Sequence, residues 1–225
     1  MFVTGTDTSV GKTLVSAVLC RVRAGSVYVK PVQSGAADGD DDGADVAALA
    51  GVPTVVGPVI GPSLAPGVAA RLAGEDLLLP ELLAVVDRAA TDHPDRPLVV
   101  EGAGGLLVEL TSDGATCADV AAELGLRVVV VARPGLGTLN HTALTLAELD
   151  RRGLDLAGVV VSGYPGDPDL ATRTNLTELD RIARGRLAGV VPLLDPPTPE
   201  ALEAASDWIT PALGGTADPA RWLAR

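Results

Sequence analysis

The sequence predicts a doubly wound α/β fold, in which one mostly parallel sheet is flanked by helices and a single domain spans residues 1–225. Three observations predict it. Apolar runs of strand length recur, and they are continuous rather than alternating, as expected for strands buried on both faces of a parallel sheet. Helical patterns lie between the runs, which favours right-handed crossovers. A glycine-rich loop joins the first run to the first helical pattern.

Six apolar runs are expected to be strands. They are "MFVT" (1–4), "VYVK" (27–30), "PLVVEG" (97–102), "RVVVVAR" (127–133), "LAGVVVSG" (156–163) and "LAGVVPLL" (187–194). After the helical run "LVSAVLCRVR" that follows the first loop, helices are expected in "PELLAVVDRAATDH" (80–93), "ADVAAELG" (118–125), "NHTALTLAELDRRG" (140–153) and "TNLTELDRIARGR" (174–186). Residues 35–74 are rich in Gly, Pro and Asp, with only a short helix signal at 44–50, and are interpreted as a long functional excursion.

Composition excludes several classes of function. A net charge of −12 argues against a nucleic-acid partner, because backbone binding needs clustered Lys and Arg. Cys20 and Cys117 are too few and too far apart for a disulfide framework or a zinc site, and both are expected to be buried in a reducing compartment. No run of 18 uncharged apolar residues occurs, so the expectation is a cytoplasmic protein without a membrane partner.

The loop "GTDTSVGKT" (5–13) resembles a phosphate-binding loop. The usual pattern places four residues between its two glycines, whereas five separate Gly5 from Gly11. The tail "GKT" is intact, and the loop stands between a predicted strand and a predicted helix. Lys12 would then reach the phosphates, and the Thr13 hydroxyl would bind Mg²⁺. The alternative is a glycine-rich turn that caps a helix.

Other polar residues follow the apolar runs, where ligands bind in open α/β sheets. Glu101 ends one run and is a candidate for the carboxylate linked to Mg²⁺ beside a phosphate loop, the alternative being a strand-end acid that faces water. Lys30 ends another run, with Ser34 four residues on, and it either stabilises phosphoryl charge or is an ordinary exposed lysine. In the acid run 38–45, Asp45 opens an apolar stretch and is a cap or a metal ligand, while residues 40–42 are expected to be solvated.

Together these motifs resemble dethiobiotin synthetase, a family of the P-loop superfamily, over nearly the whole chain. "GTDTSVGKT" looks like that family's own stretched loop. "KPVQSG" (30–35), "LAPGVAA" (64–70), "EGAGGLLVEL" (101–110) and "GLGTLNHTALT" (135–145) follow in the family's order.

The resemblance implies an ATP- and Mg²⁺-dependent ligase of biotin biosynthesis. Its substrates would be 7,8-diaminononanoate, CO₂ or bicarbonate, and ATP, and the ureido ring of dethiobiotin would close through a carbamate and a carbamic-phosphoric anhydride. Lys12 and Lys30 would be catalytic, and Thr13, Asp45 and Glu101 would hold the metal. The resemblance also implies a homodimer with the diamine near the interface.

The remaining site residues are likewise implied by the resemblance. The nucleotide would be bound by Ser9, Val10, Gly11, Lys12, Thr13, Leu14, Asp45, Glu101, Gly102, Ala103, Gly104, Ser162, Gly163, Pro192 and Leu193. The diamine would be bound by Thr8, Ser34 and, from the second subunit, Gly137, Thr138 and Asn140.

One position departs from the family, and two other classes of protein share the fold. An asparagine that contacts the nucleotide base usually follows the "GVVV" strand, but here the chain reads "SGYP". A ParA- or MinD-like switch ATPase is the main alternative, although such proteins usually carry an extra lysine early in the loop, where this chain has Asp7 and Thr8. A cobyrinate-type amide ligase would need a glutaminase domain, for which 225 residues leave no room.

Overall fold

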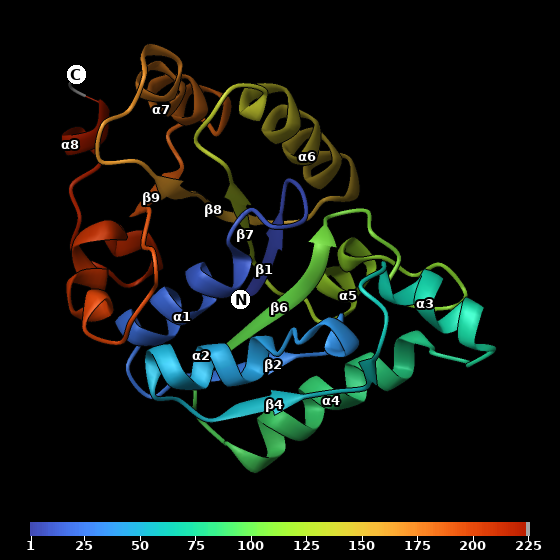
Figure 1. Ribbon diagram of the computed structural model, residues 1–225. Coiled ribbons are helices and arrows are strands. Elements are labelled where there is room, and N and C mark those ends of the chain that lie inside the picture. Colours follow the sequence, from blue (N-terminus) through green and yellow to red (C-terminus); the bar gives the residue numbers. More distant parts are fainter. Residues whose placement is uncertain (224–225) are drawn as a thin grey trace.

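The computed structural model describes residues 1–223. Seven parallel strands form the central sheet in the order β4-β2-β6-β1-β7-β8-β9, which confirms the predicted doubly wound fold (Figure 1). The strands are β1 (Phe2–Gly5), β2 (Val27–Lys30), β4 (Thr54–Val56), β6 (Leu98–Gly105), β7 (Val128–Ala132), β8 (Leu156–Tyr164) and β9 (Leu187–Pro192).

All six predicted strands are present, but the sheet has a seventh that the sequence did not reveal. β4 pairs with β2 at one edge and lies within residues 35–74. A second, two-stranded sheet joins β3 (Gln33–Ser34) to β5 (Val59–Ile60). Residues 35–74, where the sequence indicated only a short helix at 44–50, thus also contain β4, β5 and a further helix at Pro66–Ala73. These strands have two or three residues each, too few for a recognisable apolar run.

Helices cover both faces of the sheet. They are α1 (Lys12–Val22), α2 (Asp42–Ala50), α3 (Pro66–Ala73), α4 (Leu79–Asp92), α5 (Cys117–Glu123), α6 (Thr138–Arg152), α7 (Leu170–Ile182) and α8 (Ala220–Leu223), with 3-10 segments η1 (Ala36–Asp38), η2 (Ala201–Trp208) and η3 (Pro211–Leu213). The largest difference from the predicted bounds is in α7, which begins and ends four residues before the predicted 174–186. It begins early because Asp169 caps it by accepting a hydrogen bond from the Thr172 N–H.

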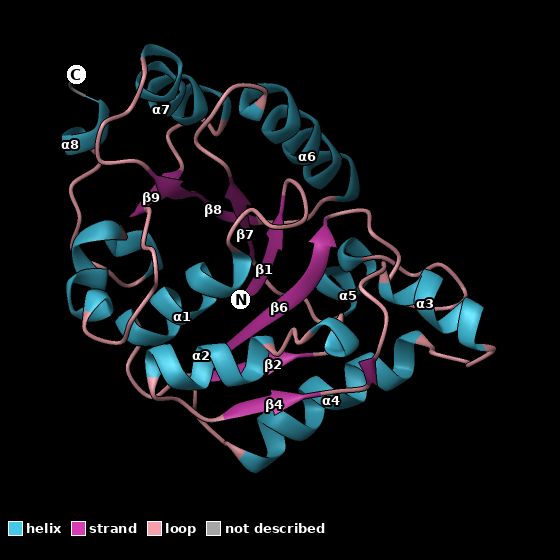
Figure 2. Ribbon diagram, viewed as in Figure 1, coloured by secondary structure: helices cyan, strands magenta, loops and turns pink. Residues whose placement is uncertain are grey.

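Figure 2 shows helices on both faces of the sheet, and the buried side chains form two aliphatic cores, one under each layer of helices. The core under α4, α5, α6 and α7 contains Leu82, Leu149 and Leu179, and the core under α1, α2 and η2 contains Leu19 and Leu202. Both cysteines are buried, as expected. No helix in the described chain is both long and apolar enough to cross a membrane.

The order of the strands positions the site. From β1 the chain moves to β2, β4 and β6 on one side of the sheet, and then crosses to β7, β8 and β9 on the other. Ligands bind at such a switch point, beyond the carboxyl ends of the strands. The loop after β1 lies at this point, with the ends of β2 and β6 on one side of it and the end of β7 on the other (Figure 1).

Candidate active site

The loop between β1 and α1 has the backbone of an anion-binding loop. Ser9 and Gly11 both adopt a left-handed conformation, with φ of 57° and 89°. A side chain at Gly11 would also collide with the Ser162 hydroxyl, because a Cβ there would lie 2.4 Å from Oγ. α1 begins directly after this glycine, so the free N–H groups and positive dipole of its first turn face the loop.

Lys12 is the first residue of α1 and is buried. Its ammonium lies 3.4 Å from the backbone oxygen of Asp7, within the loop. Burial lowers the pKa of Lys12, and the nearby Glu101 carboxylate partly offsets this effect. The ammonium is therefore held over the loop, where a phosphate chain would lie.

Glu101 is the centre of the site and is completely buried. Its Oε2 accepts hydrogen bonds from Ser16 Oγ at 2.6 Å and from Tyr28 OH at 3.1 Å. Its Oε1 accepts from Lys30 Nζ at 3.0 Å and from Thr13 Oγ1 at 3.3 Å. Glu101 is therefore held inside the protein, and the alternative of a strand-end acid that faces water is wrong.

The register of β2 against β6 brings Lys30 to this carboxylate. Val29 pairs with Val100, so Lys30 and Glu101 come next on adjacent parallel strands. The Lys30 ammonium is buried and also lies 2.5 Å from Asp42 Oδ2. Burial lowers the pKa of Lys30, but the two carboxylates outweigh burial and raise it above its ordinary value. Lys30 is thus a fixed positive charge, not an ordinary exposed lysine.

Asp42 joins the site although the sequence predicted that it is solvated. Its Oδ1 accepts a hydrogen bond from Thr13 Oγ1 at 2.8 Å, and its side chain is 23% exposed. Burial favours the neutral acid, but the Lys30 charge and hydrogen bonds from Lys30 and Thr13 lower the pKa of Asp42 overall. The error has a local cause: Asp41 caps the helix by accepting from the Ala44 N–H, so α2 begins at Asp42 instead of at 44.

Asp45, the acid chosen from the sequence, is exposed on α2. Within residues 1–223, its side chain forms no hydrogen bond or ion pair. Partial burial and the neighbouring carboxylates, led by Asp42, raise its pKa. The structure therefore places Asp42, rather than Asp45, beside Thr13 and Glu101.

The oxygen atoms of Thr13, Asp42 and Glu101 fit a magnesium ion. The carboxylates of Asp42 on α2 and Glu101 on β6 both lie within hydrogen-bond distance of the Thr13 hydroxyl oxygen on α1. Mg²⁺ usually takes one or two carboxylates and completes its shell with water and substrate phosphates. The described residues contain no cluster of three or more His, Cys, Asp or Glu that could hold a metal by itself.

A cleft of 340 Å³ brings together ten of the 21 predicted site residues. It is lined by Thr8, Ser9, Gly11, Lys12, Thr13, Lys30, Gln33, Ser34, Asp40, Asp42, Glu101, Ala103 and Gly104. The phosphate loop, the end of β2, the start of α2 and the end of β6 thus meet in one place.

Several predicted residues lie outside this lining. Val10 is buried in the core beside α1, Leu14 is partly buried against the same core, and Gly102 is buried against Cys117. Ser162 packs against Gly11, while Leu193 is 62% exposed after β9. The other two predicted residues of these loops, Gly163 and Pro192, lie near the ends of β8 and β9.

The segment predicted to serve a second subunit begins α6. Gly137 is the N-cap of this helix, and Asn140 is exposed in its first turn. Thr138 is completely buried in its own subunit, and its hydroxyl has no hydrogen-bond partner within the described chain. Only the backbone of Thr138 is therefore available to a ligand outside the subunit.

Two partners of Glu101 were missed by sequence reasoning. Tyr28 stands two residues before Lys30 on β2, and Ser16 stands one turn after Thr13 on α1. A period of two on a strand and of three to four on a helix places each on the same side as a predicted site residue. That periodicity is a usable signal once the site residues are assumed.

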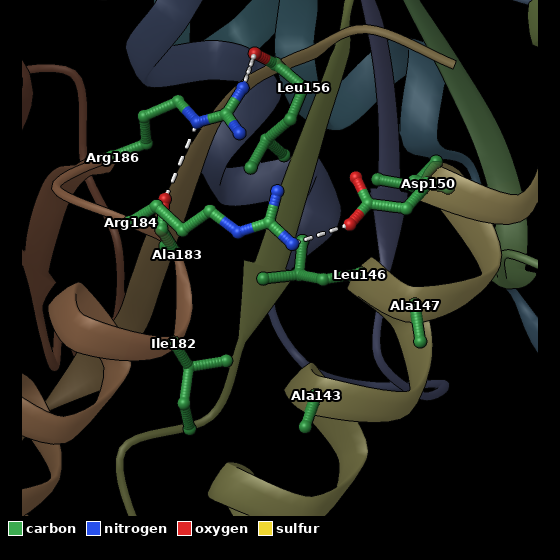
Figure 3. Close-up of a pocket in the computed structure, with 10 residues that line it drawn as sticks. Ala143, Leu146, Ala147, Asp150, Leu156, Ile182, Ala183, Arg184 and Arg186 are labelled. Carbon is green, nitrogen blue, oxygen red and sulfur yellow. Dashed lines mark hydrogen bonds and ion pairs between the residues drawn. The ribbon is translucent and has the colours of Figure 1, made fainter. Parts of the chain in front are cut away.

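Another cavity lies away from the cleft, between α6 and α7 (Figure 3). It measures 160 Å³, and Leu156 and Arg186 place it at the amino ends of β8 and β9. Arg184 is paired with Asp150 at its mouth. The cavity therefore lies at the amino ends of the strands, whereas the phosphate loop follows the carboxyl end of β1, and it is not part of the candidate site.

Comparison with known proteins agrees with the geometry. The model of a family described as "AAA domain" matches residues 1–201. An ATP-dependent dethiobiotin synthetase from Mycolicibacterium vanbaalenii is 48% identical, with 84% of this chain and 85% of the relative covered. A synthetase of the same name from a Parafrankia strain is 45% identical, with 100% of this chain and 98% of the relative covered. Another, from Mycobacterium avium, is 44% identical, with 96% of this chain and 99% of the relative covered.

Solved structures with a similar fold are much more distant in sequence. A ParA family ATPase from Chlorobium tepidum superposes with a TM-score of 0.54 at 11% identity, covering 91% of this chain and 89% of its own. The MinC:MinD cell division complex of Aquifex aeolicus gives 0.54 at 11% identity, covering 89% of this chain and 85% of its own. At this identity the likeness shows only a shared fold, and it does not favour the ParA- or MinD-like alternative. The chain belongs to the AAA domain family and, within it, to the ATP-dependent dethiobiotin synthetases.

Proposed function

We propose that this chain is an ATP-dependent dethiobiotin synthetase whose reaction takes place in the cleft beyond β1, β2 and β6. An amine of 7,8-diaminononanoate adds to CO₂ as a carbamate and releases a proton. The carbamate oxygen takes the γ-phosphoryl group of ATP, and ADP leaves. The second amine then attacks the carbamoyl carbon, so that phosphate and a proton leave and the ureido ring closes.

The observation that carries this proposal is the buried lysine held by two carboxylates beside the phosphate loop. The reaction needs no nucleophilic side chain, because both nucleophiles are supplied by the substrates. It needs positive charge, fixed in place, where the carbamate and the transferring phosphoryl group develop negative charge. Lys30 is restrained by Glu101 and Asp42, and Lys12 by the loop, so neither has to reorganise.

Lys30 acts in this proposal as a charge and not as a base. Its carboxylate neighbours favour the ammonium form, since they raise its pKa. A protonated amine cannot accept a proton from the diamine. We therefore assign Lys30 to electrostatic stabilisation of the carbamate, and Lys12 to the nucleotide phosphates.

Thr13, Asp42 and Glu101 would hold Mg²⁺, whose positive charge neutralises phosphate oxygens when it is bound. We propose Asp42 in place of Asp45 because only Asp42 contacts Thr13. Ser34 and Thr8, which also line the cleft, would contact the diamine. The enzyme would work in the cytoplasm, since the reaction consumes ATP.

A homodimer is also proposed, with the start of α6 facing the diamine of the second subunit. Large apolar side chains are exposed here: Leu136 by 86% and Leu144 by 63%, with Leu107 of the neighbouring loop exposed by 53%. Such a group of exposed leucines favours an interface over a free surface. Asn140, exposed beside them, would then reach the partner's cleft.

The test of the activity is ADP release with both substrates or with either one omitted. We expect turnover only when 7,8-diaminononanoate and bicarbonate are both present, and dethiobiotin in equal amount to ADP. Lys12→Ala is the control for contaminating ATPases. ADP release that is indifferent to the diamine would contradict the synthetase and favour a switch ATPase.

The test of the shared site is complementation between two inactive variants. In a symmetric dimer, Lys30→Ala and Asn140→Ala remove residues that would serve the same cleft from different subunits. Mixed after dissociation, they should recover about a quarter of the wild-type sites, since half of the dimers are mixed and each holds one intact cleft. No recovery, with mixed dimers demonstrated by mass, would show that each cleft is complete within one subunit.

A further inference from the structure

The two oxygens of the Glu101 carboxylate have different neighbours. Oε1 accepts hydrogen bonds from Lys30 and Thr13, whose side chains line the cleft. Oε2 accepts from Ser16 Oγ at 2.6 Å and from Tyr28 OH at 3.1 Å, and neither of these two residues lines the cleft. Both are completely buried, like Glu101 itself. One oxygen therefore faces the site, and the other is held by the interior of the protein.

Packing does not account for the hydroxyl of Tyr28. The residue lies in the aliphatic core under α1 and α2, and β2 pairs it with Val99 of β6. A phenylalanine ring would fill the same space without taking a polar group out of water. A buried hydroxyl costs free energy unless it is hydrogen-bonded, and the Glu101 carboxylate supplies the acceptor. The hydroxyl thus indicates a role at Glu101.

Ser16 also directs its hydroxyl at Glu101. It lies inside α1, where a serine usually turns its hydroxyl to solvent or to the backbone carbonyl four residues earlier. Here the hydroxyl donates to Glu101 of β6 at 2.6 Å, which is the range of hydrogen bonds to a charged carboxylate. Donors from two separate elements, α1 and β2, therefore hold the same oxygen.

Two donors on one oxygen restrict the rotation of the carboxylate. The last torsion of a glutamate side chain has broad minima, so an unrestrained carboxylate turns readily about its bond. Hydrogen bonds to Oε2 remove that freedom and keep Oε1 directed at Thr13 and Lys30. Loss of groups that orient a metal ligand in this way typically lowers metal affinity by about 10–100-fold.

We infer that Ser16 and Tyr28 are positioning residues for the magnesium site, and that they hold Glu101 with Oε1 directed at the metal ion. This inference rests on the proposed function, since the metal and its ligands belong to that proposal. Neither residue touches the metal or a substrate, and each acts through Glu101.

Calorimetry of ADP binding, once with Mg²⁺ and once with EDTA, measures this role without turnover. The ratio of the two affinities is the contribution of the metal ion. Ser16→Ala and Tyr28→Phe each remove one hydroxyl, and together they should lower this ratio by about tenfold or more. The affinity for ADP in EDTA should not change, because Lys12 and the phosphate loop are intact. A general loss of folded protein would instead affect both measurements alike.

Ser26→Ala is the matched control for the loss of a buried serine hydroxyl. Ser26 is completely buried just before β2, and its hydroxyl donates to the backbone oxygen of Arg23, away from the site. Its affinity ratio should equal that of the wild type. Asp42→Asn removes a proposed metal ligand directly, so it should lower the ratio and shows that the assay detects the site.

Three results would overturn the positioning role. An unchanged ratio in the double variant, with a lowered ratio in Asp42→Asn, would leave the metal site in place without it. An unchanged ratio in both would reject the assignment of the metal ligands as well. Equal losses of affinity in Mg²⁺ and in EDTA would assign the two hydroxyls to the structure of the phosphate loop. The synthetase proposal survives each of these results, because it is tested by dethiobiotin formation.

Discussion

Replacing Glu101 by glutamine should destabilise the protein as well as impair catalysis. From sequence alone, this change is expected to lower turnover, raise the Mg²⁺ requirement and leave folding unaffected. The buried position of Glu101 alters the last point, because its carboxylate balances the buried charge of Lys30. Glutamine keeps the size and one acceptor oxygen but has no charge.

The expected loss in the free energy of unfolding follows from how deeply Lys30 and Glu101 are buried. Lys30 and Glu101 are 3% and 0% exposed, so the ammonium cannot turn to water when its partner is neutral. Removing one member of a buried pair typically costs about 3–5 kcal/mol. Asp42, 23% exposed, still contacts Lys30, which favours the lower end, about 3 kcal/mol. For a domain of this size, that loss corresponds to a melting temperature lower by about 6–12 °C.

Thermal and chemical denaturation of the wild type and the variant measure this loss. The matched control is Glu109→Gln, since Glu109 pairs with Arg71 where both side chains are 43% exposed, and loss of an exposed pair costs about 1 kcal/mol or less. A melting temperature of Glu101→Gln within about 2 °C of the wild type would refute the argument that Lys30 depends on this carboxylate.

Three further predictions concern the site. Lys12→Ala and Lys30→Ala should both nearly abolish turnover, but only Lys12→Ala should also weaken ATP binding by calorimetry; near-normal turnover in Lys30→Ala would remove it from the catalytic set. Asp42→Asn should raise the Mg²⁺ concentration needed for half-maximal rate by about tenfold or more, whereas Asp45→Asn, one turn along the same helix, should behave as the wild type. If instead Asp45→Asn raised this concentration and Asp42→Asn did not, Asp45 would be the metal ligand, as the sequence predicted. Because Ser162 stands where the family usually has an asparagine and packs against the phosphate loop, kcat/KM for CTP, GTP and UTP should approach that for ATP; a preference for ATP of about a thousandfold, roughly 4 kcal/mol, would contradict this.

The fold was predictable because continuous apolar runs identify strands that are buried on both faces. β2 matches its prediction residue for residue, and the other five predicted strands differ only at their ends. β4 was missed since its three residues, Thr54–Val56, are half-buried at the edge of the sheet and follow a stretch rich in Gly and Asp. An edge strand of that length owes its conformation to pairing with β2, which is a tertiary effect.

The site was predictable where a motif fixes the backbone, and not where a side chain depends on a helix boundary. Lys12 and Thr13 follow from the loop, and Lys30 and Glu101 from their places at strand ends. The choice of a metal ligand among the acids of 38–45 depended on the residue at which α2 begins. That residue is set by one capping hydrogen bond, from the Ala44 N–H to Asp41. Three consecutive aspartates, Asp40, Asp41 and Asp42, are candidates for the cap, so the sequence does not show at which of them the helix begins.

The charges in the cleft explain why this protein should need a metal ion to hold a triphosphate. Its lining has two cations, Lys12 and Lys30, and three carboxylates, Asp40, Asp42 and Glu101. Lys30 is already balanced by Asp42 and Glu101, which leaves Lys12 and the N-terminus of α1 to face the phosphates. One ammonium and the partial charge of a helix end cannot offset the several negative charges of ATP. The same carboxylates that hold Lys30 would therefore repel the nucleotide unless a divalent cation stood between them. In the proposed mechanism, one set of acids would thus both position the lysine for the carbamate and impose the requirement for Mg²⁺.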